Sequence, residues 1–221
     1  MREIIFDTET TGLDPSQGHR IIEIGCVELV NLVPTGNVFH KYLNPERDIP
    51  AEATKIHGLT EEFLKDHPVF KEIFQEFLDF IGEAPLVAHN AEFDMRFINW
   101  ELKNIGHQEI PVSRTVDTLQ LARSRFPGSP NNLDALCKRL GVDNSNRTKH
   151  GALVDSEILA AVYLELKGGK QAGLELVQQK TSAMVTSQKK ARAPRSFPPS
   201  REELEAHGKF ISTLKEPLWL K

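Results

Sequence analysis

The stretch Asp7-Thr8-Glu9-Thr10-Thr11-Gly12 places two carboxylates at the end of the most convincing strand in the sequence. The residues before it, 2–6, form a short apolar run of the kind that lies buried in a sheet. Side chains two positions apart on a strand point the same way, so Asp7 and Glu9 emerge on one face. Two adjacent carboxylates repel each other unless a cation neutralises them, and oxygen ligands without a nearby cysteine favour Mg²⁺ or Mn²⁺ over zinc. A lone pair of this kind also fits an ordinary polar turn, so the choice depends on further carboxylates.

Length and composition are those of a globular protein. The chain has 221 residues, which is enough for one domain with a sizeable core and an additional segment outside it. Its 39% hydrophobic and 26% charged residues are close to the average for globular proteins. It contains no apolar run of about 18 residues and no signal-peptide pattern, so we expect a soluble, cytoplasmic protein. Cys26 and Cys137 fit neither a disulfide framework nor a zinc site, and we expect both to be buried thiols.

Charge is distributed unevenly along the chain. The net charge is −4, but residues 176–201 contain six basic residues and no acidic one, so residues 1–175 are strongly acidic. An acidic domain that acts on a phosphodiester would need bound cations to attract its substrate, which agrees with a metal site at Asp7 and Glu9.

The remaining pattern predicts an α/β domain with a mixed sheet. We expect strands at 20–30 and 36–43, separated by Pro34-Thr35-Gly36, to form an antiparallel meander with the first strand. Two short helical pieces are expected within 49–65. Strands and helices then alternate, with helices at 68–82, 89–105, 119–126, 132–140 and 151–166 and strands at 85–88 and 115–118. An antiparallel start followed by this alternation predicts a mixed sheet flanked by helices.

Three further residues carry chemistry that matches the first pair of carboxylates. Asp94 lies on a helix about 100° away from the core-facing Phe93, so it can face a cleft. His150 lies in a loop before the last helix, and Asp155 is expected in the second turn of that helix. A loop histidine can move while a helix-borne aspartate is fixed, which suits a general base beside a metal ligand.

With these residues assembled, the pattern D-x-E … N-x-x-F-D … H-x(4)-D resembles the DEDD superfamily of 3′–5′ exonucleases, in its histidine subclass. Within that superfamily, residues 1–168 are similar to the proofreading subunits of bacterial DNA polymerase III. The runs that carry this resemblance are Asp7–Gly12, Lys55–Gly58, His89–Asp94, Asn132–Cys137 and His150–Asp155. The resemblance implies a ribonuclease H-like fold, with a mixed five-stranded sheet flanked by helices, and hydrolysis of DNA from its 3′ end.

The resemblance also implies a role for each motif residue. Four carboxylates would hold two divalent cations, Mg²⁺ or Mn²⁺: Asp7, Glu9, Asp94 and Asp155. His150 would accept a proton from the attacking water. Six residues become candidates for holding the terminal nucleotide of a single-stranded or frayed 3′ end: Thr10, Leu13, Ile56, His57, Asn90 and Phe93. His57 also fits a capping role, and Leu13 also fits ordinary loop packing.

Residues beyond the exonuclease domain (1–168) have a different character. The segment 169–199 is rich in Gly, Ser, Pro and bases without apolar periodicity, which predicts a flexible basic linker. A capping box at Ser200 to Glu203 opens a short helix in segment 200–221, whose apolar residues would be exposed in a free monomer. They could pack back onto the parent domain, or they could bind a partner.

The resemblance implies partners and a place at the replisome on the nucleoid. Residues Leu214, Leu218 and Trp219 would contact the polymerase III alpha subunit, residues 179–185 the sliding clamp, and a small theta-like subunit would bind in addition. The clamp segment lacks the aromatic ending expected of such a peptide. Two other functions stay open: a free-standing exonuclease for RNA, which would not need the linker and tail, and a non-catalytic polymerase adaptor.

Overall fold

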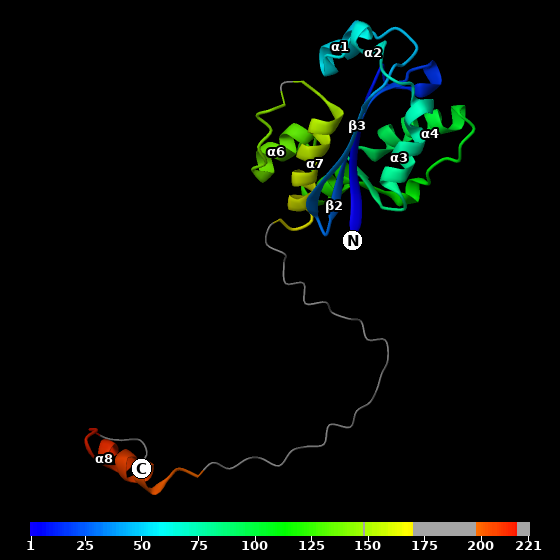
Figure 1. Cartoon of the computed structure of the whole chain (residues 1–221). Helices are drawn as coiled ribbons and strands as arrows, with labels where there is room; N and C mark the ends of the chain where they lie inside the picture. Colours follow the sequence, from blue (N-terminus) through cyan, green and yellow to red (C-terminus); the bar gives the residue numbers. More distant parts are fainter. Residues whose placement is uncertain (148, 170–197, 216–221) are drawn as a thin grey trace. The chain divides into compact units, whose positions relative to one another are not determined.

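The computed structural model describes residues 1–147, 149–169 and 198–215 of the chain. They belong to two units, Met1–Glu175 and Leu176–Lys221, and each unit is described by itself. The first unit is built on a five-stranded sheet with the strand order β3-β2-β1-β4-β5 (Figure 1). Its strands are β1 (Arg2–Thr10), β2 (Ile21–Val30), β3 (Val33–Tyr42), β4 (Leu86–Ala88) and β5 (Thr115–Asp117). Its helices are α1 (Ala51–His57), α2 (Glu61–Leu64), α3 (Phe70–Ile81), α4 (Ala91–Asn104), α5 (Thr118–Arg125), α6 (Leu133–Leu140) and α7 (Ala152–Leu166), with 3-10 turns η1 (Pro15–Gln17) and η2 (Val112–Arg114).

Strand β1 lies at the centre of the sheet and carries both carboxylates of the D-x-E pair. It pairs antiparallel with β2 and parallel with β4. The outer pairs are β2 with β3, antiparallel, and β4 with β5, parallel. The predicted meander and mixed five-stranded sheet are therefore confirmed. Because β1 and β4 are parallel, their carboxyl ends meet at one edge of the sheet, which is where open α/β sheets bind ligands.

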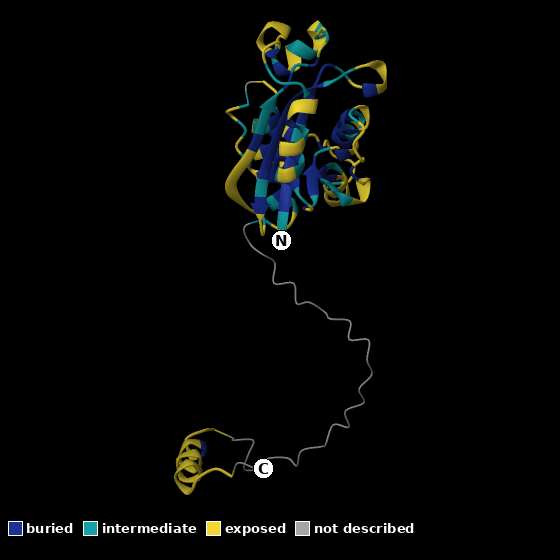
Figure 2. Cartoon of the chain, turned by 45° about the vertical axis from the view of Figure 1, so that its right-hand side comes forward, coloured by how far each residue is buried: buried dark blue, intermediate teal, exposed yellow. Residues whose placement is uncertain are grey.

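Both faces of the sheet are covered, and the alternation along β1 divides its side chains between the two layers. Ile4 and Phe6 pack with residues of α3 and α4, whereas Ile5 packs with residues of α5, α6 and α7. All three side chains are fully buried. Figure 1 shows α3 and α4 on one side of the strands and α6 and α7 on the other, and Figure 2 shows the buried strands between them.

The second hairpin differs from the prediction. The expected break at Pro34-Thr35-Gly36 is wrong, because β3 begins at Val33 and includes these residues. Asn31 and Leu32 make the reversal instead, with φ values of 52° and 67°. A two-residue turn with both φ values positive suits the twist of a hairpin, but Leu rarely adopts it, so composition did not reveal the turn. Proline is tolerated in β3 because the strand lies at the sheet edge.

Strand β2 passes very close to the start of α7 at Gly25. A Cβ atom on this residue would lie 2.2 Å from the backbone nitrogen of Leu153. The Ser156 hydroxyl donates a hydrogen bond to the Gly25 carbonyl at 2.9 Å. This approach fixes the first turn of α7, and with it Asp155, against the sheet.

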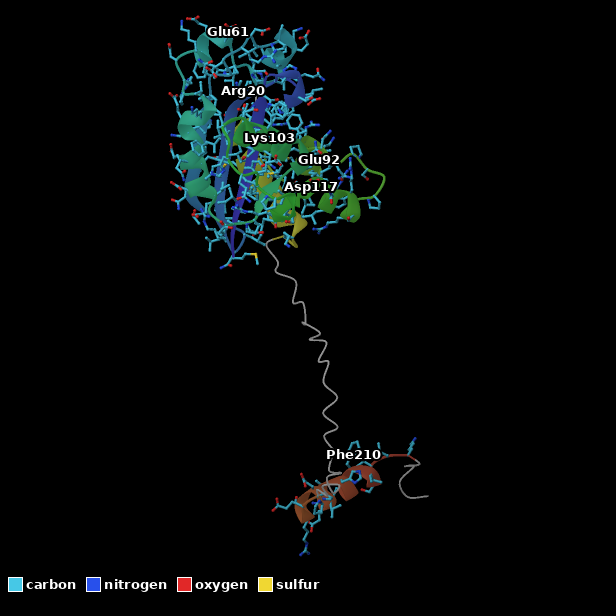
Figure 3. The ribbon with its side chains drawn as sticks, turned by 90° about the vertical axis from the view of Figure 1, so that its right-hand side faces the viewer. Arg20, Glu61, Glu92, Lys103, Asp117 and Phe210 are labelled. Atoms are coloured by element: carbon cyan, nitrogen blue, oxygen red, sulfur yellow. The ribbon has the colours of Figure 1, made fainter. Side chains whose placement is uncertain are left out.

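The second unit contains α8 (Arg201–Ser212) within the described residues 198–215. The predicted capping box begins this helix: the Ser200 hydroxyl accepts from the Glu203 N–H at 3.2 Å, and the Glu203 carboxylate accepts from the Ser200 N–H at 2.7 Å. Leu204 and Phe210 project from α8 as exposed apolar side chains, the latter labelled in Figure 3.

Several sequence expectations concern residues near or beyond the described parts. Leu214 is described and exposed. Leu218, Trp219 and the clamp segment 179–185 lie outside the described residues, as does most of the linker, so the boundaries of the three segments stay predictions. Cys26 and Cys137 are buried free thiols, as expected. None of the helices in the described parts has both the length and the apolarity needed to cross a membrane.

Candidate active site

The motif residues line one cavity of about 410 Å³ at the carboxyl ends of β1 and β4. Asp7 and Glu9 come from β1, and Asp94 comes from the first turn of α4. Asp155 lies in the first turn of α7, one turn earlier than expected, because that helix begins at Ala152. The cavity is lined by Asp7, Thr8, Glu9, His89, Asn90, Phe93, Asp94, Asn132, Leu133, Asp134, Arg147, His150 and Asp155.

Asp94 is held by the strand that it faces. Its Oδ1 accepts hydrogen bonds from the backbone N–H of Thr8 at 3.0 Å and from the Thr8 hydroxyl at 2.7 Å. Asn90, just before α4, adopts a left-handed conformation with a φ of 70°, which asparagine tolerates better than most residues. Its N–H donates to Asp117 Oδ1 at 3.0 Å. The turn from β4 to α4 thereby aims Asp94 at β1.

Glu9, His150 and Asp155 bring potential ligand atoms within 4.8 Å of one another. His150 Nδ1 lies 3.2 Å from Asp155 Oδ2. The His150 side chain is 47% exposed, whereas that of Asp155 is 5% exposed. The histidine therefore lies at the solvent side of the cluster and the carboxylate at its base, which lets the histidine reach a water while the carboxylate stays fixed.

Burial and the charges of neighbouring carboxylates raise the pKa values of Asp7, Glu9 and Asp94. Burial is the largest cause for each of them. The pKa of Asp7 lies well above its ordinary value, with the charge of Asp94 as the next cause. The pKa of Glu9 rises to about 8, with Glu23 as the next cause, and that of Asp94 rises to about 7. A divalent cation among these oxygens would favour their charged forms, and hard oxygen donors are the ligands that Mg²⁺ and Mn²⁺ prefer.

The metal-free protein is expected to lose stability as the pH rises. Glu9 and Asp94 titrate near pH 4 to 4.5 in an unfolded chain, but keep their protons to about pH 8 and 7 in the folded protein. Between these limits the folded state binds more protons, so the free energy of unfolding falls with rising pH. Thermal denaturation in EDTA between pH 4.5 and 8 measures this, and Mn²⁺ added at pH 8 should restore stability. A metal-free stability that rises across this window would contradict the prediction.

A second cavity, of about 600 Å³, adjoins the first and shares Thr8, Glu9 and Phe93 with it. It is lined by five of the six residues expected to hold the terminal nucleotide: Thr10, Leu13, Ile56, His57 and Phe93. Asn90 lines the first cavity instead. Leu13 and Ile56 are 78% and 54% exposed, so both present apolar surface to a ligand rather than to the core.

His57 is buried in the wall of the second cavity with one ring nitrogen unpaired. Its Nδ1 accepts from the Leu59 N–H at 3.0 Å, so the proton of the neutral ring lies on Nε2. Burial lowers the pKa of His57, which favours that neutral form. Within the described parts of the chain, Nε2 is the only buried side-chain nitrogen or oxygen without a hydrogen-bond partner. The capping role and a donor role toward a ligand are therefore compatible.

Several residues at the site were not assigned a role from the sequence, among them Thr8 and Arg147 in the first cavity and Glu23 beside Glu9. The Arg147 side chain is 8% exposed and lies in the first cavity. Glu23 is buried on β2, in register with Glu9. A carboxylate in an otherwise apolar strand, and a basic residue three positions before His150, were the available signals.

Comparisons with known proteins identify the family. A family model described as Exonuclease matches residues 4–163. The DNA polymerase III subunit epsilon of Rickettsia felis is 52% identical over 222 residues, covering 97% of either chain. The chain belongs to this family of exonuclease subunits. The epsilon subunit of Haemophilus influenzae, another relative, is 43% identical and covers 97% of this chain and 91% of its own length.

A solved structure supports the exonuclease fold. Exonuclease X in complex with 5′ overhanging duplex DNA has a TM-score of 0.60 at 28% identity, over 74% of this chain and 90% of that one. The ribonuclease H-like fold and the membership of the epsilon-type 3′–5′ exonucleases, both implied by the motifs, are confirmed. Exonucleases of the DEDD type use divalent metals, and the carboxylates and His150 in the first cavity provide a donor set that fits them.

Proposed function

We propose that this chain removes nucleotides from the 3′ end of DNA in a reaction with two divalent ions, as the proofreading subunit of a DNA polymerase III. The observation that carries the proposal is the meeting of four carboxylates and a histidine in one cavity, beside a second cavity with apolar walls. The first cavity suits a scissile phosphate with its metal ions, and the second suits the sugar and base of the terminal nucleotide.

The residues of the first cavity have two different roles in the proposed reaction, metal binding and proton transfer. Two divalent ions, Mg²⁺ or Mn²⁺, would activate the attacking water and stabilise the departing 3′ oxygen. Asp7, Glu9, Asp94 and Asp155 would hold these ions, and Thr8 keeps Asp94 in position. His150 accepts the proton of the water, because it is exposed enough to reach solvent and imidazole generally titrates near neutral pH.

The residues of the second cavity hold the terminal nucleotide. Leu13, Ile56 and Phe93 provide apolar and aromatic surface on which a sugar and a base can lie. His57 Nε2 donates a hydrogen bond to an oxygen of the nucleotide. These contacts do not select one base over another. The site accepts a single strand, so a paired 3′ end must first unpair. A mismatched end needs less free energy to unpair, and it therefore enters the site more often than a matched end.

His57→Asn is expected to raise KM for an oligonucleotide about three- to tenfold, with kcat little changed. Asparagine still offers an oxygen to the Leu59 N–H but lacks the donor at Nε2, so one hydrogen bond to the bound nucleotide is lost. Initial rates at varied oligonucleotide concentration measure this. His107→Asn is the control, because His107 is exposed and lines neither cavity. An unchanged KM for His57→Asn would show that Nε2 does not contact the substrate.

The polymerase contact is proposed for segment 200–221. Its helix α8 exposes Leu204 and Phe210, which suits insertion into an apolar groove on the polymerase III alpha subunit. A contact of residues 179–185 with the sliding clamp and the binding of a small theta-like subunit complete the proposal, in which the protein acts at the replisome.

Deletion from Ser200 onward is expected to leave nuclease activity intact and to abolish co-purification with the alpha subunit. The active-site cavities are lined entirely by residues of the first unit, so they do not require this segment. Pull-down of tagged alpha subunit with full-length and truncated chains measures the association. Retained association would locate the contact in the exonuclease domain instead.

The substrate is tested with 5′-labelled single-stranded oligonucleotides of one sequence, made as DNA and as RNA. In Mg²⁺ we expect a ladder of DNA products shortened from the 3′ end, and in EDTA no cleavage. Preferred degradation of RNA would favour the free-standing RNA exonuclease. Cleavage of neither polymer, with or without the alpha subunit, would favour the non-catalytic adaptor.

A further inference from the structure

Arg147 makes hydrogen bonds to three charged or titratable side chains of the first cavity. Its Nε and Nη2 donate to the two carboxylate oxygens of Asp155, at 2.5 and 2.6 Å. Its Nη1 donates to Asp134 Oδ1 at 2.7 Å. Nη2 also lies 2.8 Å from His150 Nδ1. The guanidinium therefore joins the first turns of α6 and α7 to the loop that carries the proposed general base.

Arg147 is the fixed cation of a strongly acidic cavity. Within the described parts of the chain, the lining of this cavity contains no lysine and no second arginine, but five carboxylates. Its forked pair with Asp155 is almost entirely shielded from water, since the two side chains are 8% and 5% exposed. A two-pronged, charge-assisted pair of this kind is among the stronger polar interactions in proteins.

The contacts of Arg147 engage atoms that the reaction needs. Both oxygens of Asp155 accept from the guanidinium, so a divalent ion at Asp155 must compete with Arg147 for them. The bond to His150 has a second consequence. A guanidinium nitrogen only donates, so His150 Nδ1 is the acceptor and the proton of the neutral ring lies on Nε2. The lone pair that could accept a proton from water is thereby directed at Arg147.

We propose that Arg147 is a positioning residue that substitutes for a divalent ion at Asp155. In the metal-free protein it holds Asp155 and His150 in place and offsets the charge of the acidic cavity. Binding of the metal displaces the guanidinium from the Asp155 oxygens and frees His150 Nδ1. Asp134, which is largely exposed and outside the proposed ligand set, remains as the anchor of Arg147.

The test compares Arg147→Met with a matched control, Arg20→Met. Arg20, labelled in Figure 3, makes the same kind of forked pair with the buried carboxylate of Glu101, at 2.6 and 2.9 Å, but lines neither cavity. Two quantities are measured for each purified full-length chain without turnover: the thermal midpoint in EDTA and in saturating Mn²⁺, and the Mn²⁺ dissociation constant by titration calorimetry.

We expect both substitutions to lower the thermal midpoint in EDTA, because each leaves a buried carboxylate without its partner. In saturating Mn²⁺ the thermal midpoint of Arg147→Met should return close to that of wild type, whereas the thermal midpoint of Arg20→Met should stay below it. Arg147→Met should also bind Mn²⁺ about tenfold more tightly than wild type, since no guanidinium competes for Asp155. Weaker or unchanged Mn²⁺ binding, or a deficit that Mn²⁺ does not reduce, would overturn the proposal.

Arg147→Lys is the second variant, for the case in which the methionine variant does not fold. An ammonium keeps the charge but cannot pair with both oxygens in the same fork, so its Mn²⁺ affinity should lie between those of wild type and the neutral variant. An affinity for Mn²⁺ equal to that of wild type would count against competition at Asp155.

This inference rests on the proposed role of Asp155 as a metal ligand, and Asp155→Asn separates the two. If Asp155→Asn weakens Mn²⁺ binding while Arg147→Met does not change it, Asp155 is a metal ligand. In that case only the proposed role of Arg147 is overturned. If Asp155→Asn binds Mn²⁺ as wild type does, both the proposed metal site and the role of Arg147 are overturned.

Discussion

Asp7→Ala is expected to lower the rate of metal-dependent DNA cleavage by at least about a thousandfold. Asp7 lines the same cavity as Glu9, Asp94 and Asp155, and burial, followed by the charges of Asp94 and Glu9, raises its pKa. Its loss would remove one of the four proposed ligands, and with it much of the several kcal/mol of transition-state stabilisation that bound metal ions would supply. Single-turnover cleavage of a labelled oligonucleotide in Mg²⁺ measures the rate, and Mn²⁺ titration of the same variant should show weakened binding.

The control for Asp7→Ala is Asp79→Ala. Asp79 is exposed on α3 and lines neither cavity, so its removal changes the net charge equally without touching the site. We expect this control to cleave like wild type. Near-normal turnover by Asp7→Ala would defeat the metal assignment. In the metal-free state Asp7→Ala should also be more stable at pH 8, because it removes one of the mutually repelling carboxylates.

His150→Ala is expected to slow cleavage by roughly 10²–10⁴-fold, the usual scale for loss of a general base. The four carboxylates remain in place, so Mn²⁺ affinity should stay nearly unchanged. His150 also belongs to the cluster of potential metal-binding side chains, which makes this second measurement decisive. A large loss of Mn²⁺ affinity would identify His150 as a ligand rather than a base.

The pH dependence of the residual activity provides a further check on His150. A general base works only when it is deprotonated, so the cleavage rate rises as the pH increases through the pKa of the base. The plot of rate against pH for wild type should therefore contain a rising part that the alanine variant lacks. His107→Ala, at an exposed position away from both cavities, should keep the wild-type profile. Identical profiles for wild type and His150→Ala would assign proton transfer to another group.

Much of this fold could be predicted because its elements carry strong local signals. The apolar run of β1 and the helical spacing in 68–82 led directly to β1 and α3. The reversal at Asn31 and Leu32 could not be predicted, since Leu at a positive φ is unusual and Pro34-Thr35-Gly36 is a stronger turn signal. At this turn, the pairing of β2 with β3 outweighs the local conformational preference of Leu32.

The site could be predicted only in part, for a similar reason. Asp7 and Glu9 follow from the period of a strand, and the grouping with Asp94, His150 and Asp155 came from a resemblance rather than from spacing. Thr8 acts through a contact between elements distant in sequence, its hydrogen bond to Asp94 on α4, and Arg147 acts through the fold of the loop between α6 and α7. Glu23 in an apolar strand and Arg147 three positions before His150 carry only weak local signals, and Thr8 carries none.

The central claim is that Asp7, Glu9, Asp94 and Asp155 together hold two divalent ions. The most direct measurement is an anomalous difference map from crystals grown with Mn²⁺ and thymidine monophosphate. We predict two manganese peaks about 3.5–4 Å apart among these four carboxylates, with the nucleotide in the adjoining cavity. Manganese bound by other residues, or no manganese among the four carboxylates, would contradict the account.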